Sequence, residues 1–180
     1  EEPLAYFETF PATWSSPSVE NPTKKLESTA VRHCLQQLST EFETLKLVQN
    51  DRNRPYFEES DWHISLTHSY PYVAAACSRK KQIGIDLEKP GRNIEKIAPR
   101  FLHAREWEKW KSQSNLLTLA WSAKESIYKA VGKSGLSFQK EMEINDFNQN
   151  PCKAQVSTGE EVEIFWEEYK EFSLTVALIQ

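Results

Sequence analysis

Apolar residues recur at helical spacing in three stretches of the chain, which predicts three helical regions. The first begins at Thr23, a residue type suited to an N-cap, and carries apolar residues at positions 26, 30, 34 and 38. The second covers residues 94–111, and Pro99 predicts an interruption within it. The third covers residues 116–131. Its apolar stripe consists of Leu116, Leu119, Ala120, Ala123, Ile127 and Ala130.

Shorter apolar or alternating stretches predict the β-strands. Residues 64–67 and 72–77 indicate two strands around a Ser-Tyr-Pro turn, and residues 162–167 and 171–179 indicate a closing hairpin. A further strand follows the polar turn at residues 79–82. Weak alternation over residues 4–9 indicates an edge strand, and the Pro- and Ser-rich residues 11–22 indicate a loop.

The strand after the polar turn reads IGIDLE and carries two carboxylates, Asp86 and Glu88. Side chains at i and i+2 of a strand project from the same face. Two carboxylates so close together repel each other unless a cation or a proton lies between them. A pair of this kind, taken alone, is more often part of a solvated strand face.

The predicted helix at residues 116–131 contains the sequence WSAKESIYK, in which Glu125 and Lys129 are one turn apart. Such a pair is commonly a surface ion pair. Here Glu125 lies opposite the apolar stripe together with Trp121, and Tyr128 flanks them, which predicts a helix covered on both sides. Three carboxylates and a lysine near an internal cleft suit Mg²⁺ holding a phosphate.

These two segments together resemble the signature of the 4'-phosphopantetheinyl transferase superfamily. The family pattern is G-[IV]-D-x-E, then about forty residues, then [FW]-[ST]-x-K-E-[SA]-x-x-K, and it matches residues 84–88 and 121–129. Further segments extend the resemblance over most of the chain from about residue 24. They are Ala30-Val31-Arg32, Arg54-Pro55-Tyr56, Ser65-Leu66-Thr67-His68-Ser69 and Gly132-Lys133-Ser134-Gly135-Leu136-Ser137.

The resemblance implies an α+β fold made of two pseudo-symmetric halves, with the active site in the cleft between them. The polar turn at residues 79–82 predicts their junction, so residues 1–80 form an N-terminal half that contributes to coenzyme A binding. Residues 81–180 form a C-terminal half with the metal and catalytic motifs. The length resembles the longer, Sfp-type members, in which one chain forms the site, and we therefore expect a monomer.

By the same resemblance, the reaction transfers the 4'-phosphopantetheine group of coenzyme A to a serine hydroxyl of an apo carrier protein and releases 3',5'-ADP. The resemblance assigns Mg²⁺ to Asp86, Glu88 and Glu125, directly or through water. Lys129 would offer charge to a phosphate oxygen or to the leaving group. Asp86, Glu125 and Lys129 are the expected catalytic residues, and Glu125 is the candidate base for the serine hydroxyl.

The coenzyme A phosphates are assigned by the resemblance to Arg32, Arg54 and His68, with Thr67 adding a hydroxyl and Lys129 reaching a phosphate. Arg54 stands where the family carries a lysine, and its guanidinium could make two hydrogen bonds. An arginine on a helix is often solvated, and His68 before a turn could be purely structural. The run at residues 100–103, Arg-Phe-Leu-His, matches an R-F-F segment of the family and is the candidate docking surface for an acidic carrier protein.

Composition is consistent with this interpretation without suggesting it. The 180 residues carry a net charge of −4, so no global basic field favours nucleic acid. Three scattered cysteines, at 34, 77 and 152, are expected to be reduced core thiols of a cytoplasmic protein. No apolar stretch is long enough to span a membrane, and no secretory signal opens the sequence.

Two other classes of function stay open at this point. A non-catalytic coenzyme A or carrier-binding relative is disfavoured because all three carboxylates and both lysines of the second motif are present. An unrelated Mg²⁺-dependent phosphohydrolase is disfavoured because the chain has no glycine-rich phosphate loop and no metal-ligand histidine pair. The sequence leaves open which carrier protein is served and whether Mn²⁺ would replace Mg²⁺.

Overall fold

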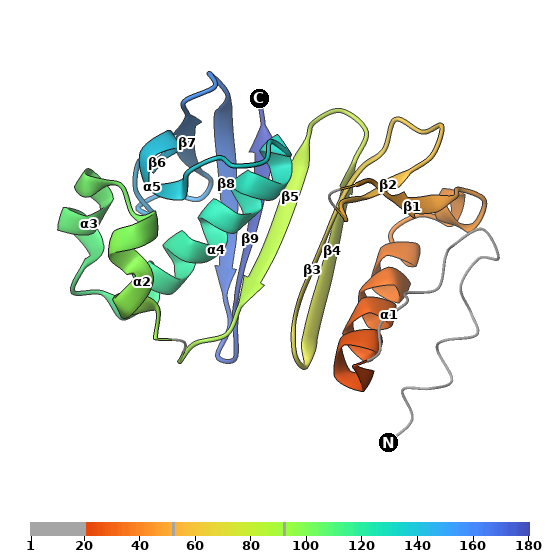
Figure 1. Cartoon of the computed structure of the whole chain (residues 1–180), viewed down its shortest axis with the longest axis horizontal. Helices are drawn as coiled ribbons and strands as arrows, with labels where there is room; N and C mark the ends of the chain where they lie inside the picture. Colours follow the sequence, from red (N-terminus) through yellow and green to blue (C-terminus); the bar gives the residue numbers. More distant parts are fainter. Residues whose placement is uncertain (1–20, 52, 92) are drawn as a thin grey trace. The chain divides into compact units, whose positions relative to one another are not determined.

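The computed structural model describes residues 21–180 apart from residues 52 and 92, and it mixes helices and strands as an α+β protein does. The chain divides into two compact units between Lys80 and Lys81 (Figure 1). Each unit has its own apolar cluster. The predicted α+β class is confirmed, whereas the pseudo-symmetry of the halves and the cleft between them stay predictions. The strand expected at residues 4–9 lies outside the described residues.

The first unit is built on an antiparallel hairpin with a helix packed against both of its strands. Its described elements are α1 (Pro22–Gln36), η2 (Thr40–Glu43), β1 (Leu47–Gln49), β2 (Pro55–Phe57), β3 (His63–Ser69) and β4 (Tyr72–Ser78). The N-cap of α1 is Asn21, whose side chain accepts from the N–H of Thr23 at 3.0 Å. The predicted N-cap at Thr23 is therefore wrong, because Pro22 occupies the first helical position, where no N–H is needed.

The core of the first unit gathers around Phe42, which is fully buried. Its ring lies 4.7 Å from that of Phe57 and 5.1 Å from that of Trp62. Leu35 of α1 completes this cluster with Leu47 and Ile64. Helix α1 ends at Gln36, so position 38, which was expected on its apolar stripe, is exposed.

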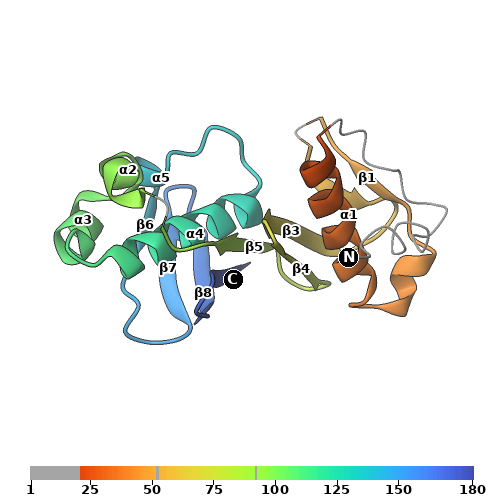
Figure 2. The same ribbon diagram turned by 90° about the horizontal axis from the view of Figure 1, so that it is seen from below.

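The second unit is a five-stranded antiparallel sheet covered on one face by its longest helix (Figure 2). Its described elements are β5 (Ile83–Glu88), α2 (Ile94–Phe101), α3 (Ala104–Trp110), α4 (Ser114–Val131), α5 (Phe138–Glu141), β6 (Met142–Ile144), β7 (Cys152–Val156), β8 (Glu161–Glu168) and β9 (Ser173–Ile179). The strand order is β5-β9-β8-β7-β6, and the predicted closing hairpin corresponds to β8 and β9. Helices α2 and α3 pack against α4.

The helical region predicted at residues 94–111 breaks after Phe101 rather than at Pro99, which lies inside α2. The break is set by a new helix start at His103. The His103 side chain accepts from the N–H of Arg105, and the Glu106 carboxylate accepts from the N–H of His103 at 2.6 Å. This reciprocal capping box starts a new helix at Ala104. Pro99 is tolerated inside α2, where it removes a single backbone hydrogen bond.

Helix α4 buries most of the predicted stripe and more besides. Leu119, Ala120, Ala123, Ile127 and Ala130 are fully buried as expected, and Leu117 is buried in place of the half-exposed position 116. Polar residues of the same helix are also buried, among them Ser122, Lys124 and Ser126. The helix is therefore covered on more than one side. No helix in the described part of the chain is long and apolar enough to cross a membrane.

Candidate active site

Helix α4 lies directly on β5, and Gly84 permits the contact. A Cβ atom at position 84 would lie 1.9 Å from the carbonyl oxygen of Ser126 and 2.7 Å from the backbone nitrogen of Ala130. Only hydrogen fits between strand and helix at this point. Because alternate residues share a face of a strand, Asp86 and Glu88 project toward α4 as Gly84 does.

The neighbouring strand gives the same orientation. In the register of the sheet, Asp86 pairs with Thr175 of β9, so both side chains lie on one face. The Thr175 hydroxyl lies 2.9 Å from that of Ser122 on α4, and both residues are fully buried. The two carboxylates of β5 are thus on the helix-covered face of the sheet. They are each 6% exposed, which excludes the solvated strand face.

Asp86 is held by Lys129 of α4. The lysine Nζ lies 2.7 Å from Oδ1 of Asp86 and also donates to the carbonyl oxygen of Ile85 at 3.0 Å. The side chain of Lys129 is 28% exposed, while that of Asp86 is buried. Both residues were predicted for the site, and the structure pairs them directly. The expected contact of Lys129 with a phosphate stays a prediction.

Glu88 is held by an aromatic residue of the same helix. The indole Nε1 of Trp121 donates to Oε1 of Glu88 at 2.8 Å. The Trp121 ring continues into a row of aromatic contacts, 5.0 Å from Phe101 and 5.6 Å from Phe138. Trp121 therefore connects the acidic strand to the apolar interior. The sequence placed it on the correct face of the helix but did not predict this hydrogen bond.

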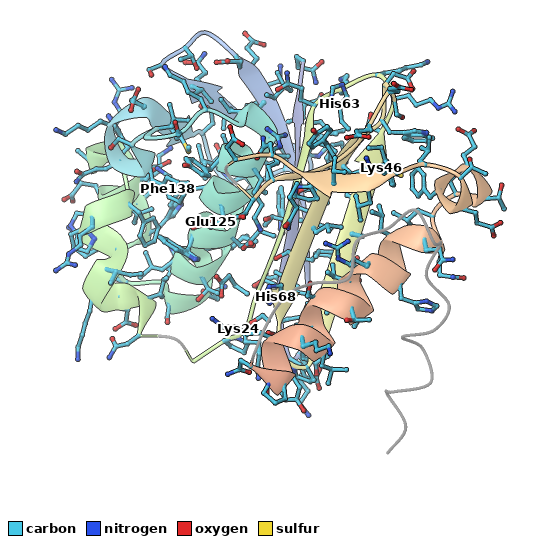
Figure 3. All side chains as sticks on the ribbon, turned by 45° about the vertical axis from the view of Figure 1, so that its right-hand side comes forward. Lys24, Lys46, His63, His68, Glu125 and Phe138 are labelled. Carbon is cyan, nitrogen blue, oxygen red and sulfur yellow. The ribbon has the colours of Figure 1, made fainter. Side chains whose placement is uncertain are left out.

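Glu125 lies on the helix between the two contact points. Residues four apart follow one another along one face, so Trp121, Glu125 and Lys129 form a single row on α4. The first of these contacts Glu88 and the last contacts Asp86. Glu125 is half-buried, and Figure 3 labels it on this helix. The row and β5 together bring the three predicted carboxylates to one helix–strand interface.

The donor set at this interface fits Mg²⁺, a cation that prefers carboxylate oxygen and retains bound water. In the part of the chain that the structure describes, no group of three or more acidic, histidine or cysteine side chains has converged on a single point. Lys129 contacts one oxygen of Asp86, and Trp121 contacts one oxygen of Glu88. A cation here would share these carboxylates with side chains of α4.

The predicted phosphate-binding arginines both lie in the first unit. Arg32 of α1 is 5% exposed, and burial lowers the pKa of its guanidinium below the ordinary value. Among the described residues, none forms a hydrogen bond with its buried Nη1. Arg54, just before β2, is half-buried, and burial lowers the pKa of its side chain as well. Buried guanidinium groups of this kind suit an anionic ligand.

His68 and Thr67 are neighbours on β3 and therefore point to opposite faces of the hairpin. His68 is on the α1 side, with Nδ1 3.3 Å from a carboxylate oxygen of Glu27. The other oxygen of Glu27 accepts from the N–H of Tyr70 at 2.9 Å. Thr67 is buried on the opposite face. The structure thus brings His68, but not Thr67, to the side of the hairpin that α1 covers.

An apolar pocket of about 400 Å³ lies next to Trp121. Its lining consists of Ile97, Arg100, Phe101, Trp121 and Phe138. In the predicted docking run, the aromatic residue at 101 and Leu102 are buried core residues, 3% and 1% exposed. They fill the space beneath α2, so only Arg100 and His103 of this run reach the surface.

The sequence interpretation gave no role to Lys124, although it belongs to the second motif. Its side chain is fully buried and forms an ion pair with Glu106 at 2.5 Å. A signal was present, because Lys124 follows Ala120 by four residues and precedes Ile127 by three, which places it within the apolar stripe. A lysine at such a position requires a buried partner.

Comparison with known proteins bears on this interface. The 4'-phosphopantetheinyl transferase superfamily model matches residues 82–177, which contain the whole β5–α4 interface. The 4'-phosphopantetheinyl transferase HetI of Nostoc sp. is 32% identical over 124 residues, covering 63% of this chain and 52% of the relative. The 4'-phosphopantetheinyl transferase gsp of Aneurinibacillus migulanus is 32% identical over 107 residues, covering 57% and 44%. The chain spans about half the length of these curated relatives.

Among the solved structures that the chain resembles are two holo-[acyl-carrier-protein] synthases. That of Bacillus anthracis str. Ames, in complex with CoA (3',5'-ADP), has a TM-score of 0.48 and 24% identity, covering 54% of this chain and 94% of the other. That of Thermotoga maritima has a TM-score of 0.43 and 19% identity, covering 55% and 62%.

Proposed function

Because the chain belongs to the 4'-phosphopantetheinyl transferase superfamily, we propose that it transfers the 4'-phosphopantetheine group of coenzyme A to a serine hydroxyl of an apo carrier protein. The other product is 3',5'-ADP. The observation that carries this proposal is the β5–α4 interface. It holds Asp86 against Lys129 and Glu88 against Trp121, with Glu125 between them on the helix.

Each residue of this interface has a chemical task in the proposed reaction. Glu125 accepts the proton of the serine hydroxyl as that oxygen attacks phosphorus, because it is only half-buried, whereas Asp86 and Glu88 are buried. Lys129 donates to a phosphate oxygen on which negative charge develops. Trp121 holds the carboxylate of Glu88 in a fixed orientation.

Asp86, Glu88 and Glu125 are the residues that would hold Mg²⁺. The ion, when bound, would supply positive charge to the pyrophosphate oxygens. Lys129 would compete with it for Asp86, since both positive charges would be attracted to the same buried carboxylate. Lys129→Met should therefore make the protein's thermal stability depend more strongly on added Mg²⁺ than in the wild type. An equal dependence in both proteins would argue against Asp86 as a ligand.

Coenzyme A binding is proposed to use Arg32, Arg54 and His68 of the first unit, with Thr67 in a lesser role. The buried guanidinium of Arg32 and the half-buried one of Arg54 support this proposal. If Arg32 and Arg54 hold the 3'-phosphate, their replacement by Gln should weaken coenzyme A binding by about 10- to 100-fold, the effect of one charged hydrogen bond. Dephospho-coenzyme A should bind almost equally to wild type and variants. Lys46→Gln, which removes only an exposed ion pair with Glu58, is the matched control.

Carrier docking is proposed at Arg100, which lines the pocket beside Trp121. An exposed arginine attracts the acidic surface that carrier proteins present around the modified serine. Arg100→Glu should raise the Michaelis constant for the carrier and leave that for coenzyme A unchanged. Lys111→Glu, at an exposed position of the same unit, is the control for a general effect of charge. If Arg100→Glu left the Michaelis constant for the carrier unchanged, this surface would not be part of the docking interface.

The deciding experiment is the intact mass of an apo carrier protein after incubation with this protein, coenzyme A and Mg²⁺. The carrier should gain one phosphopantetheine group. The gain should be absent with a chelator, and with Asp86→Asn, which keeps the shape of the side chain. Release of inorganic phosphate without a modified carrier would instead support a phosphohydrolase. Binding of coenzyme A without transfer to any of several carriers would favour a non-catalytic relative.

A further inference from the structure

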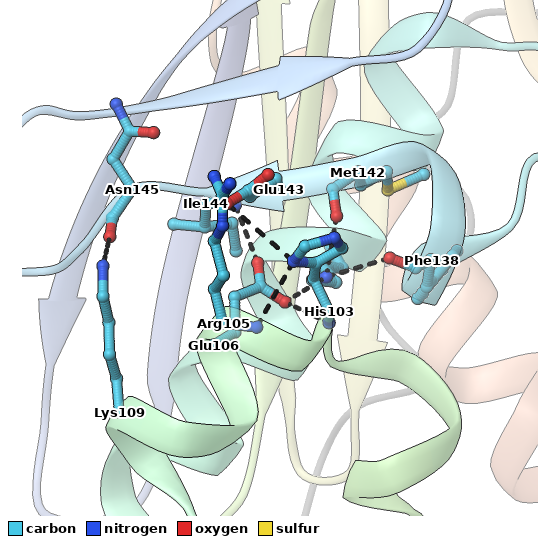
Figure 4. A network of polar contacts seen from close by, with 10 residues as sticks. His103, Arg105, Glu106, Lys109, Phe138, Met142, Glu143, Ile144 and Asn145 are labelled. Carbon is cyan, nitrogen blue, oxygen red and sulfur yellow. Dashed lines mark hydrogen bonds and ion pairs between the residues drawn. The ribbon is translucent and has the colours of Figure 1, made fainter.

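A second charged pair lies inside the C-terminal unit, away from β5. Lys124 of α4 is fully buried, and its ammonium makes three hydrogen bonds. It donates to Oε2 of Glu106 at 2.5 Å, to the carbonyl oxygen of Phe138 at 2.9 Å and to that of Met142 at 3.0 Å. These acceptors use all three N–H groups of the lysine. They come from α3, α5 and β6 (Figure 4).

The partner carboxylate is equally well used. Glu106 is 1% exposed, and its Oε2 also accepts from the N–H of His103 at 2.6 Å. Its Oε1 accepts from the N–H of Ile144 at 2.7 Å. One ion pair therefore connects the start of α3, the middle of α4, the start of α5 and both ends of β6.

Stability alone does not account for a pair in this position. Burial lowers the pKa of the Lys124 ammonium despite the opposing effect of Glu106, which means that desolvation outweighs the attraction. Well-packed apolar residues of similar volume often stabilise a folded protein as much as a buried ion pair does, or more. What apolar residues cannot supply is a fixed direction for each connected backbone group. The pair thus specifies an arrangement.

The connected groups border the proposed site. Lys124 immediately precedes Glu125, so the hydrogen bonds of the lysine fix how α4 is rotated about its axis. The carbonyl oxygen of Phe138 is held by Lys124, and the Phe138 ring lies 5.6 Å from that of Trp121 and 5.6 Å from that of Tyr128. Trp121 in turn donates to Glu88. A continuous series of contacts runs from the buried pair to the acidic strand.

We propose that Lys124 and Glu106 are positioning residues for the reaction. They fix the rotation of α4 and the place of Phe138, so that Trp121 and Glu125 face β5 in the geometry that transfer requires. The proposal rests on the proposed function and adds a role for two residues that touch neither substrate nor metal. It predicts that loosening the pair reduces turnover more than it reduces coenzyme A binding.

The test uses the double variant Lys124→Met/Glu106→Gln, because either single change would leave a buried charge without its partner and could prevent folding. Methionine fills the space of the lysine stem, and glutamine keeps an acceptor for backbone N–H groups. The control is Ile164→Ala in β8, which removes buried apolar volume from the same unit and none of the hydrogen bonds of the pair. Both proteins are assayed well below their unfolding temperatures.

Misplacement of reacting groups by about 1 Å can reduce a rate by about 100-fold. The double variant should therefore show kcat lower by about 10- to 100-fold, with the Michaelis constant for coenzyme A within about threefold of the wild type. The control should keep its kcat. Hydrogen exchange should become faster in residues 136–144 of the double variant, while β8 and β9 keep their protection.

Several outcomes would overturn the proposal. One is a folded double variant with wild-type kcat, and another is a control that loses as much kcat as the double variant. Faster hydrogen exchange spread evenly over the unit would likewise overturn it, because it would show that the pair stabilises the whole unit rather than positioning residues 136–144. Failure of the proposed function would look different, because the wild-type protein would then modify no carrier. In that case, hydrogen exchange would still show whether the pair positions residues 136–144.

Discussion

Replacing Gly84 by alanine should disturb the site without changing any of its functional groups. The new Cβ would lie 1.9 Å from the carbonyl oxygen of Ser126 and 2.9 Å from its carbonyl carbon. These are backbone atoms in the middle of α4, so no side-chain rotation can relieve the overlap. Contacts under 3.0 Å require movement, and the helix must therefore shift away from β5 by about 1 Å.

The magnitude follows from what the shift separates. Overpacking of a well-filled interior costs about 1–3 kcal/mol, which for a protein of this size lowers the melting temperature by roughly 2–12 °C. The same shift separates Lys129 from Asp86 and Trp121 from Glu88, because both contacts join the helix to the strand. A displacement of about 1 Å at reacting groups reduces kcat by about 100-fold.

The assay compares Gly84→Ala with Gly159→Ala. Position 159 has φ +104° and no atom within 4 Å of an added Cβ, so this control introduces backbone strain without steric overlap. Thermal unfolding should show a loss of stability in both variants, whereas carrier modification should fall only for Gly84→Ala. Equal activity of the two variants, at temperatures where both are folded, would refute the view that close approach of α4 to β5 sets the geometry of the site.

Three further changes test individual side chains. Glu125→Gln should reduce turnover by at least about 100-fold while coenzyme A binding stays within about threefold, and parallel losses of both would leave Glu125 as a ligand only. Trp121→Phe keeps an aromatic ring but loses the N–H donor to Glu88, so the free energy of unfolding measured in urea should fall by about 1.5 kcal/mol. An unchanged free energy would show that this hydrogen bond does not stabilise the protein. Burial raises the pKa of the Cys152 thiol to about 12, so the native protein should resist iodoacetamide at this residue at pH 8 and label there only after unfolding.

The acidic strand could be predicted from the sequence because its signal is local. Asp86 and Glu88 are two residues apart, so any strand places them on one face. Glu125 and Lys129 are related in the same way by the helical period. The contacts across the interface follow only from the register between helix and strand, which no local pattern encodes. For that reason the sequence did not predict the contact between Lys129 and Asp86, and the assignment of Lys129 to a phosphate stays a prediction.

Other differences have the same origin. The helix interruption was expected at Pro99 because proline is the strongest local signal in this segment. The actual break is set by the capping box at His103, and its carboxylate, Glu106, also binds the buried Lys124 of a distant helix. In the predicted docking segment, residues 100–103, Arg100 is exposed as its charge suggests, whereas Phe101 and Leu102 are buried in the core beneath α2. Which side of a short helix is covered depends on the neighbouring helix, and this information is distributed over distant parts of the chain.

The ion pair between Lys129 and Asp86 also has a consequence for how the protein matures. Many metal sites are assembled only when the ion arrives, and their polypeptides are unfolded without it. Here a lysine of the chain itself lies 2.7 Å from the buried carboxylate and compensates its negative charge. We therefore expect folding to be independent of metal supply. By the proposed function, exhaustive dialysis against a chelator should yield a folded, inactive protein that regains activity as soon as Mg²⁺ is added.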